Sequence, residues 1–336
     1  MIYHHPRARI DLPLSRDALP LAGSAHVWFD TLDAFGGPSD ARRNVAPTMT
    51  PHDLAKPRPI LPQLPSDRPL VMGIVNVTPD SFSDGGLAFS PEAAITRAQE
   101  MVAAGADILD IGGESTRPGA ADVPVSEEIT RTAPVIAAIR SAGIQTPISI
   151  DTRKSGVAAA ALAAGADIVN DVSALMYDPE LARVVADAGA PVCLMHAQGT
   201  PQTMQADPRY DDVLTEVYDY LARRMDFAVA QGVNAAQIMT DPGIGFGKTI
   251  AHNLSLLRGL SLFHGLGVPI LLGASRKRFI GAISGVDNAA ERMPGSIAVA
   301  LMAAGQGAQI LRVHDVAETV QALSLWRALT CVGDEV

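Results

Sequence analysis

A helix–glycine–strand pattern repeats along the chain, and it constrains the fold more than any other feature. Its clearest copies are VAAGADILDIGG at 102–113 and LAAGADIVNDVS at 162–173, and weaker copies begin near residues 141, 186, 231, 265 and 304. Glycine just past a helix adopts the positive φ that ends it, and each following apolar run has the length of a buried strand. With LVMGIVNV at 70–77 there are eight runs. We therefore predict an α/β fold, a (β/α)8 TIM barrel, over a doubly wound open sheet.

The N-terminal part of the chain differs in composition from the rest. Eleven of the 24 prolines lie in residues 1–69. PHDLAKPRPILPQLPSDRP at 51–69 is therefore expected to be an extended, semi-rigid linker. The aromatic residues of AHVWFDTLDAF at 25–35 are enough for a short docked strand or helix. We predict an N-terminal extension and linker over 1–66 and the barrel over 67–332.

Charge and cysteine usage exclude several classes of protein. The net charge of −10 argues against binding to nucleic acid or to an anionic membrane surface. Two cysteines are too few for a disulfide framework, which favours a reducing, cytoplasmic location. The N-terminus has no apolar segment of a secretory signal, and no run is long enough to cross a bilayer.

Polar residues follow the predicted strands, and in a TIM barrel the strand ends meet at one rim. The residues at these ends are Asn76, Gly112, Gly113, Glu114, Asp151, Asn170, Asp171, His196, Asp241, Ser275, Arg312 and His314. Any one of them has an ordinary alternative as a turn former or helix cap. Lys277, Arg312 and His314 form a cationic group near the last two strands, where barrels commonly bind phosphate. Three of the four lysines lie just past a strand end, as expected for anion binding at the rim.

Two loops carry further candidate ligands. TPDSFSDGG at 78–86 offers hydroxyl and carboxylate oxygens that suit Mg²⁺, and its glycines would let it move. In the second loop, Arg117 suits a carboxylate or a phosphate. The register of DPGIGFGK at 241–248 does not match a nucleotide-binding P-loop, and the chain has no nucleophile elbow or zinc spacing. These features favour a displacement driven by leaving-group stabilisation.

Six motifs in order resemble one enzyme family. They are NVTPDSFSDGG (76–86), STRPGA (115–120), IDTRK (150–154), DPGIGFGK (241–248), SRK (275–277) and RVHDV (312–316). Over about residues 68–330 the chain resembles dihydropteroate synthase, the sulfonamide target of folate synthesis. The resemblance implies condensation of 6-hydroxymethyl-7,8-dihydropterin pyrophosphate with 4-aminobenzoate, with Mg²⁺ as cofactor, in a homodimer.

The resemblance also implies roles for particular residues. The pterin would be bound by Asp151, Asn170, Asp241 and Lys277, and the pyrophosphate by Asn76, Arg312 and His314. Asn76 would also bind Mg²⁺, and Asp80 and Lys277 would be catalytic. The aminobenzoate would be framed by Thr116, Arg117, Pro118, Phe82, Phe246 and Ser275.

Three other functions are compatible with the fold. A pterin-binding methyltransferase shares the barrel and the carboxylates but has less use for SRK and RVHDV. A non-catalytic pterin-binding paralogue would be expected to lack the loop motifs, which are intact here. A Schiff-base aldolase would need a desolvated lysine, whereas Lys277 lies between two arginines beyond its strand.

Overall fold

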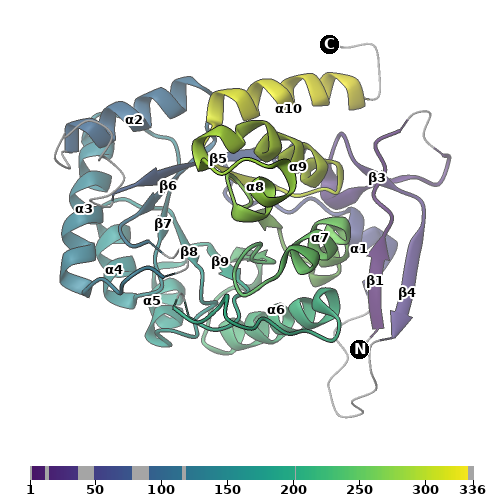
Figure 1. Cartoon of the computed structure of the whole chain (residues 1–336), viewed down its shortest axis with the longest axis horizontal. Helices are drawn as coiled ribbons and strands as arrows, with labels where there is room; N and C mark the ends of the chain where they lie inside the picture. Colours follow the sequence, from purple (N-terminus) through teal and green to yellow (C-terminus); the bar gives the residue numbers. More distant parts are fainter. Residues whose placement is uncertain are drawn as a thin grey trace.

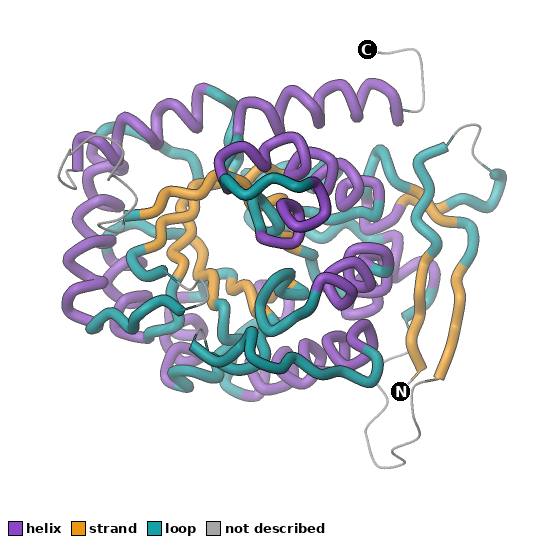
Figure 2. The backbone as a smooth tube through the Cα atoms, viewed as in Figure 1, coloured by secondary structure: helices purple, strands orange, loops and turns teal. Residues whose placement is uncertain are grey.

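Eight parallel strands form a closed ring at the centre of the molecule, with helices around it (Figures 1 and 2). The computed structural model describes residues 2–11, 15–36, 49–77, 91–115, 119–200 and 202–331. The barrel strands are β5 (Leu70–Asn76), β6 (Ile108–Gly112), β7 (Ile148–Asp151), β8 (Ile168–Asp171), β9 (Val192–Met195), β10 (Ile238–Asp241), β11 (Leu271–Leu272) and β12 (Ile310–Val313). Thr240 pairs with Ile270 in a parallel bridge that closes the ring between β10 and β11. The predicted TIM barrel is confirmed.

A helical segment follows every strand and covers the outside of the barrel (Figure 2). These segments are α2 (Pro91–Ala103), α3 (Val125–Ser141), α4 (Ser155–Ala163), α5 (Glu180–Ala188), α6 (Val213–Ala230), α7 (Ile250–Arg258), α8 (Arg278–Ser284), α9 (Met293–Gly305) and α10 (Val316–Thr330), with the 3₁₀ helices η3 (Ala235–Gln237), η4 (Leu260–Leu266) and η5 (Ala289–Arg292). The repeat glycines have positive φ, as the pattern predicts: 105, 143, 165, 189, 232, 267 and 307. No helix in the described part of the chain is long and apolar enough to cross a membrane.

The inside of the barrel has its own apolar cluster. Its buried members come from seven of the eight strands: Leu70, Met72, Ile108, Ile168, Cys193, Met239, Leu271 and Ile310. Ile60, Leu61 and Leu64, which precede β5, pack against this cluster. The segment that leads into the barrel therefore helps to cover the end of the barrel at which the strands begin.

The N-terminal residues fold against the flank of the barrel (Figure 1). Their elements are β1 (Ile2–Pro6), β2 (Leu19–Pro20), η1 (Leu21–Gly23), β3 (Trp28–Phe29), β4 (Leu32–Gly36) and α1 (Pro51–Ala55). Strands β1 and β4 are antiparallel, and β1 contacts η4. Buried Tyr3 stacks edge-on against Tyr218 of α6. The aromatic segment at 25–35 thus contributes one strand to each of two small sheets, β3 to the pair with β2 and β4 to the pair with β1.

The expectation of an extended linker over 51–69 is wrong at its start, where the chain forms α1. The Thr50 hydroxyl accepts from the Asp53 amide, the Asp53 carboxylate accepts from the Thr50 amide, and Pro51 occupies the first turn. This capping box satisfies amides that a short helix would otherwise leave unpaired. Beyond it, buried Arg58 donates to the carbonyl oxygens of His264 and Val268 at 2.9 and 3.0 Å. Its guanidinium therefore joins the linker to η4.

Because the extension shares its buried residues with the barrel, a cavity in it should destabilise the whole chain. Leu21 is fully buried in the main core, whereas Ile2 is 57% exposed. Leu21→Ala should lower the free energy of unfolding by about 2–5 kcal/mol. Ile2→Ala, the control, should change it by less than about 0.5 kcal/mol. Urea unfolding followed by circular dichroism measures both, and equal small effects would show that the extension is not part of the folding unit.

Candidate functional site

The alternation of side chains along the barrel strands places a polar layer directly above the inner apolar cluster. Residues two apart in a strand point to the same face. The inner residues Ile108, Ile168, Met239 and Ile310 are followed two positions later by Asp110, Asn170, Asp241 and Arg312. Asp151 lies in the same way at the end of β7, beside Asn170 of β8. The sequence therefore delivers carboxylates, an amide and a guanidinium to one level of the barrel interior.

Arg312 is the centre of this layer. Its Nε donates to Asp110 Oδ2 at 2.5 Å and its Nη2 donates to Asp151 Oδ2 at 2.7 Å. Asn170 approaches the same Asp110 oxygen at 3.4 Å. Asp110 and Asp151 are both buried, and the second oxygen of each, Oδ1, has no hydrogen-bond partner within the described residues. Two acceptors are thus available to a ligand that brings N–H donors into the layer.

Burial and neighbouring positive charge shift the pKa values of Asp151 and Asp241 in opposite directions. Burial raises the pKa of Asp151 to about 7, although Arg312 opposes this shift. Burial also raises the pKa of Asp241, and Lys277 opposes that. A polar layer with carboxyls that resist ionisation is characteristic of a ligand site rather than of a solvated surface.

The loop after β10 is held against the neighbouring strand ends. Asp241 Oδ1 accepts from the Gly243 amide at 2.7 Å. Lys277 Nζ donates to the carbonyl oxygen of Ile244 and lies 4.6 Å from the centre of the Phe246 ring. Burial lowers the pKa of Lys277 to about 8. Lys277 is thus half-buried although it lies between two arginines, so its position beyond the strand does not by itself argue against a Schiff base.

Two of the three strand-end lysines do not bind anions at the rim. Lys154 is buried in ion pairs with Glu114 and Glu128. Lys248 is buried, its Nζ lies 2.8 Å from His196 Nδ1, and it donates to the Phe246 carbonyl oxygen at 3.0 Å. Burial lowers the pKa of Lys248 well below its usual value. Both side-chain nitrogens are already held by other groups of the protein, so of the three only Lys277 still fits the prediction of a lysine facing a ligand.

One residue expected at the pyrophosphate, His314, meets one expected at the aminobenzoate, Ser275, just past the end of β12. His314 donates its amide to Ser275 Oγ at 3.2 Å, and its Nδ1 lies 3.0 Å from the same oxygen. Half-buried Asn76 ends β5, which pairs with β12. Asn76, Arg312 and His314 are therefore presented by two adjacent strands.

Comparison with known proteins identifies the family. The pterin-binding enzyme family model matches residues 72–314. Dihydropteroate synthase of Neisseria meningitidis serogroup B is 48% identical over 268 residues, 78% of this chain and 93% of that protein. The chain belongs to the dihydropteroate synthase family. Two Xanthomonas albilineans dihydropteroate synthase structures are similar to it, one with 4-aminobenzoic acid (50% identity, TM-score 0.75, 80% and 95% of the chains) and one with 7,8-dihydropteroate (47%, 0.73, 80% and 97%).

Five residues predicted for the dihydropteroate synthase site lie outside the described residues. They are Asp80, Phe82, Thr116, Arg117 and Pro118. Their roles at the metal and at the aminobenzoate stay predictions. Among the described ones, the structure brings Asp151, Asn170, Asp241, Lys277 and Arg312 into one layer and places Asn76, Phe246, Ser275 and His314 around it.

Asp110 is the site residue that the reading of strand ends missed. That reading took the end of the second strand to be Gly112–Glu114, two residues beyond it. A usable signal is present in ILDIGG, because an acidic residue inside an apolar strand must face something polar. Asp171 is the opposite case. Its carboxylate accepts from the amides of Ser173 and Leu175. Asp171 therefore stabilises its own loop, which is the ordinary role of a turn former that the sequence left open.

Gly243 should tolerate no side chain. Its φ is +69°, and a Cβ there would lie 1.8 Å from the His196 carbonyl oxygen. Gly243→Ala should cost at least about 3 kcal/mol of stability, because backbone would have to move. Gly143 has φ +82° with open space around it. Gly143→Ala, the control, should cost only about 1–2 kcal/mol. Urea unfolding compares the two, and equal losses would mean that the loop after β10 is not held as described.

The contribution of Asp151 to the stability of the ligand-free chain should fall as pH rises from about 4 to 7, whereas buried His196 and His264, whose pKa values burial lowers, contribute in the opposite direction. In the unfolded chain Asp151 loses its proton near its usual pKa, but in the folded chain it keeps the proton to about pH 7. The folded state then binds more protons in this window, so ionisation favours unfolding. Asp151→Asn should remove up to about 1.4 kcal/mol per pH unit of this slope. Urea unfolding at several pH values tests this, with exposed Asp187→Asn as control. Equal slopes in Asp151→Asn and the wild type would contradict it.

Proposed function

We propose that the chain condenses 6-hydroxymethyl-7,8-dihydropterin pyrophosphate with 4-aminobenzoate to give 7,8-dihydropteroate and pyrophosphate. One observation carries the proposal: two buried carboxylates, Asp110 and Asp151, are held by Arg312, and one oxygen of each has no hydrogen-bond partner among the described residues. Membership of the dihydropteroate synthase family and the similarity to structures that hold 4-aminobenzoic acid and dihydropteroate support it.

The polar layer has the groups that a pterin ring requires. The guanidine-like edge of the ring carries N–H donors, which Asp110 and Asp151 can accept. Asn170 can both donate and accept, so it suits the mixed edge beside it. Asp241 and Lys277 lie on the other side of the layer, where the Lys277 ammonium can donate to a ring acceptor. Because the layer is buried, each of these hydrogen bonds would be stronger than in water.

Leaving-group stabilisation is the chemical step that these residues can assist. The C–O bond to pyrophosphate breaks, the aniline nitrogen forms a C–N bond, and that nitrogen loses a proton. Negative charge develops on the departing oxygen, which Arg312 and His314 can stabilise from β12 and the loop after it. Phe246 and Ser275 would frame the aminobenzoate beside the pterin.

Mg²⁺ is proposed as the cofactor, with Asn76 as a ligand. No group of three or more His, Cys, Asp or Glu side chains in the described ranges could hold a metal on its own. That fits Mg²⁺, which commonly uses one or two protein oxygens and completes its coordination with water and substrate phosphate. The Asn76 amide oxygen at the end of β5 is a suitable donor. When bound, the ion would neutralise charge on the leaving pyrophosphate.

The family resemblance further supports a homodimer in the cytoplasm. Analytical ultracentrifugation of the purified chain would test the dimer, and fractionation of cells would test the cytoplasmic location.

The decisive assay mixes purified chain with dihydropterin pyrophosphate, 4-aminobenzoate and Mg²⁺ and measures dihydropteroate and pyrophosphate. The wild type should form both in equal amounts. Asp151→Ala should lose at least about 100-fold in kcat/KM, since it removes an acceptor of buried N–H groups. EDTA should abolish turnover, and added Mg²⁺ should restore it. Pterin binding without product would instead favour a methyltransferase or a non-catalytic paralogue.

A further inference from the structure

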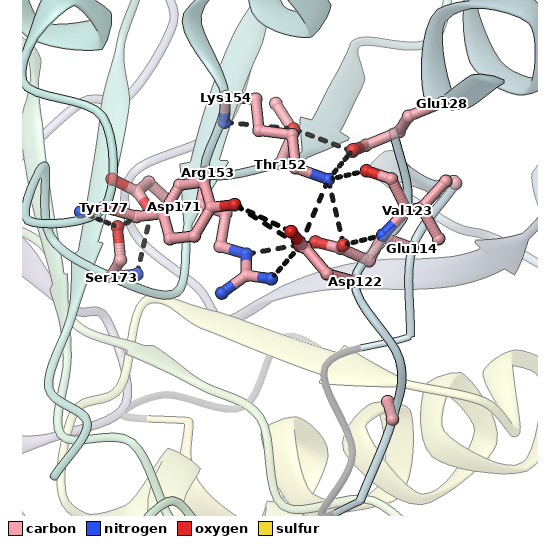
Figure 3. A network of polar contacts seen from close by, with 12 residues as sticks. Glu114, Asp122, Val123, Glu128, Thr152, Arg153, Lys154, Asp171, Ser173 and Tyr177 are labelled. Carbon is pink, nitrogen blue, oxygen red and sulfur yellow. Dashed lines mark hydrogen bonds and ion pairs between the residues drawn. The ribbon is translucent and has the colours of Figure 1, made fainter. Parts of the chain in front are cut away.

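A buried ammonium before α4 shows how this chain satisfies a polar group that is withdrawn from water (Figure 3). Lys154 Nζ donates to Glu114 Oε1 at 2.9 Å, to Glu128 Oε2 at 2.8 Å and to the Val123 carbonyl oxygen at 2.6 Å. An ammonium has three protons, and these contacts use all of them. A buried polar atom that has no such partner costs stability, so each one calls for an explanation.

The side chain of Ser149, in β7, is a buried polar group of the opposite kind. It is fully buried, and its Oγ has no hydrogen-bond partner within the described residues. The backbone around it is already paired, because β7 lies between β6 and β8 in the sheet. Ser149 therefore keeps a hydroxyl where an apolar side chain of the same size would be less costly to bury.

Ser149 faces the inside of the barrel. It lies two residues before Asp151, and residues two apart in a strand point to the same face. Seven strands supply the inner apolar cluster, whose side chains carry no oxygen or nitrogen atom, and β7 supplies Ser149 to the same interior. A partner for the Ser149 hydroxyl must therefore come from the polar layer or from a ligand that enters it.

Three polar atoms without a partner come from one corner of the barrel interior, formed by β6 and β7. Ser149 is the register partner of Asp110, and Asp151 lies next along β7 on the same face. Neighbouring strands are about 4.8 Å apart, so these side chains are adjacent. Asp110 and Asp151 each place Oδ2 on Arg312, and their Oδ1 atoms, like Ser149 Oγ, are unpartnered in the described part of the chain.

The hydroxyl changes what this corner can offer a ligand. Ionised Asp110 and Asp151 can only accept hydrogen bonds, whereas a hydroxyl can donate as well. The edge of a pterin ring carries N–H donors and also ring nitrogens that accept. Ser149 therefore adds a donor for a ring nitrogen beside two acceptors for N–H groups.

We propose that Ser149 is a further binding residue for the dihydropterin ring. Its hydroxyl donates to an accepting ring nitrogen next to the N–H groups that Asp110 and Asp151 accept. The inference rests on the proposed function for the identity of the ring. It also explains the unpartnered hydroxyl, because binding sites keep groups that cost stability in the free protein and are satisfied by the ligand.

Ser149→Ala tests the proposal, because it removes the hydroxyl with little change in volume. The Kd for dihydropterin pyrophosphate, measured by isothermal titration calorimetry with Mg²⁺ and without aminobenzoate, should rise about three- to tenfold. The KM for 4-aminobenzoate should stay close to the wild-type value. The melting temperature of the ligand-free variant should be unchanged or higher, since the substitution breaks no hydrogen bond within the free protein.

The matched control is Thr240→Val in β10. Thr240 is 1% exposed, and its Oγ1 also has no partner among the residues that the structure describes. It lies between Met239 and Asp241, which face the interior, so its side chain points to the outside of the barrel. Thr240→Val therefore removes a comparable hydroxyl from the other face and should leave the Kd for dihydropterin pyrophosphate unchanged.

The possible results separate the binding role from a structural one. An unchanged Kd in Ser149→Ala, or an equal rise in Thr240→Val, would overturn the proposal. A lower melting temperature of ligand-free Ser149→Ala would also overturn it, because the hydroxyl would then be bonded within the free protein. If the wild type binds the dihydropterin but makes no dihydropteroate, the proposed function fails, while weaker binding by Ser149→Ala still supports the binding role. A wild type that does not bind the dihydropterin would overturn both.

Discussion

The site depends on one buried guanidinium. Arg312 enters the barrel interior from β12 and bonds to Asp110 of β6 and Asp151 of β7. Without it, two carboxylates would lie close together in a layer with almost no water contact, at a large electrostatic cost. With Arg312 in place, each carboxylate accepts from the guanidinium through Oδ2, and its Oδ1 has no hydrogen-bond partner among the described residues. The interaction therefore makes an acidic layer compatible with folding, and it also places a cation inside the barrel, where the proposed reaction would use it on the leaving group.

The rest of the interior follows from the two-residue period of the strands. The same alternation that packs Ile108, Ile168 and Ile310 into the lower cluster raises Asp110, Asn170 and Arg312 above it. Core and site are therefore consecutive layers of one barrel. On the outside, Arg153 and Lys154 hold the loop after β6 through ion pairs with Glu114 and Asp122.

The barrel could be predicted from the sequence because its signal is repeated. Each helix end carries a glycine with the same backbone requirement, and each following strand is short and rich in buried apolar residues. Strand ends were found in the same way, which is why Asp151, Asn170, Asp241 and Arg312 were identified as site candidates. Asp110 was missed because it lies inside its strand rather than after it. An acidic residue inside an apolar strand is a sign that it faces something polar, and the direction of its side chain shows that this is the site.

Contacts between distant residues were the part that sequence could not supply. Lys154 and Lys248 look like exposed rim lysines along the chain, yet each is buried against acceptors from remote segments. The helix at 51–55 depends on the capping box of Thr50 and Asp53, whereas the number of prolines in this segment suggested an extended chain. In each case a specific tertiary or capping contact overrides the local tendency. The dihydropteroate synthase motifs located the site, but they do not show which tertiary contacts hold the polar residues around it.

The most direct test of the account is a crystal structure of the chain with a dihydropterin bound. The account predicts that ring N–H groups lie within about 3 Å of Asp110 Oδ1 and Asp151 Oδ1, at the level of the barrel where Asn170 and Asp241 also face the ring. It further predicts that Arg312 stays on the leaving-group side of the ligand. A ring bound outside this layer, with both Oδ1 atoms still unpartnered, would contradict it.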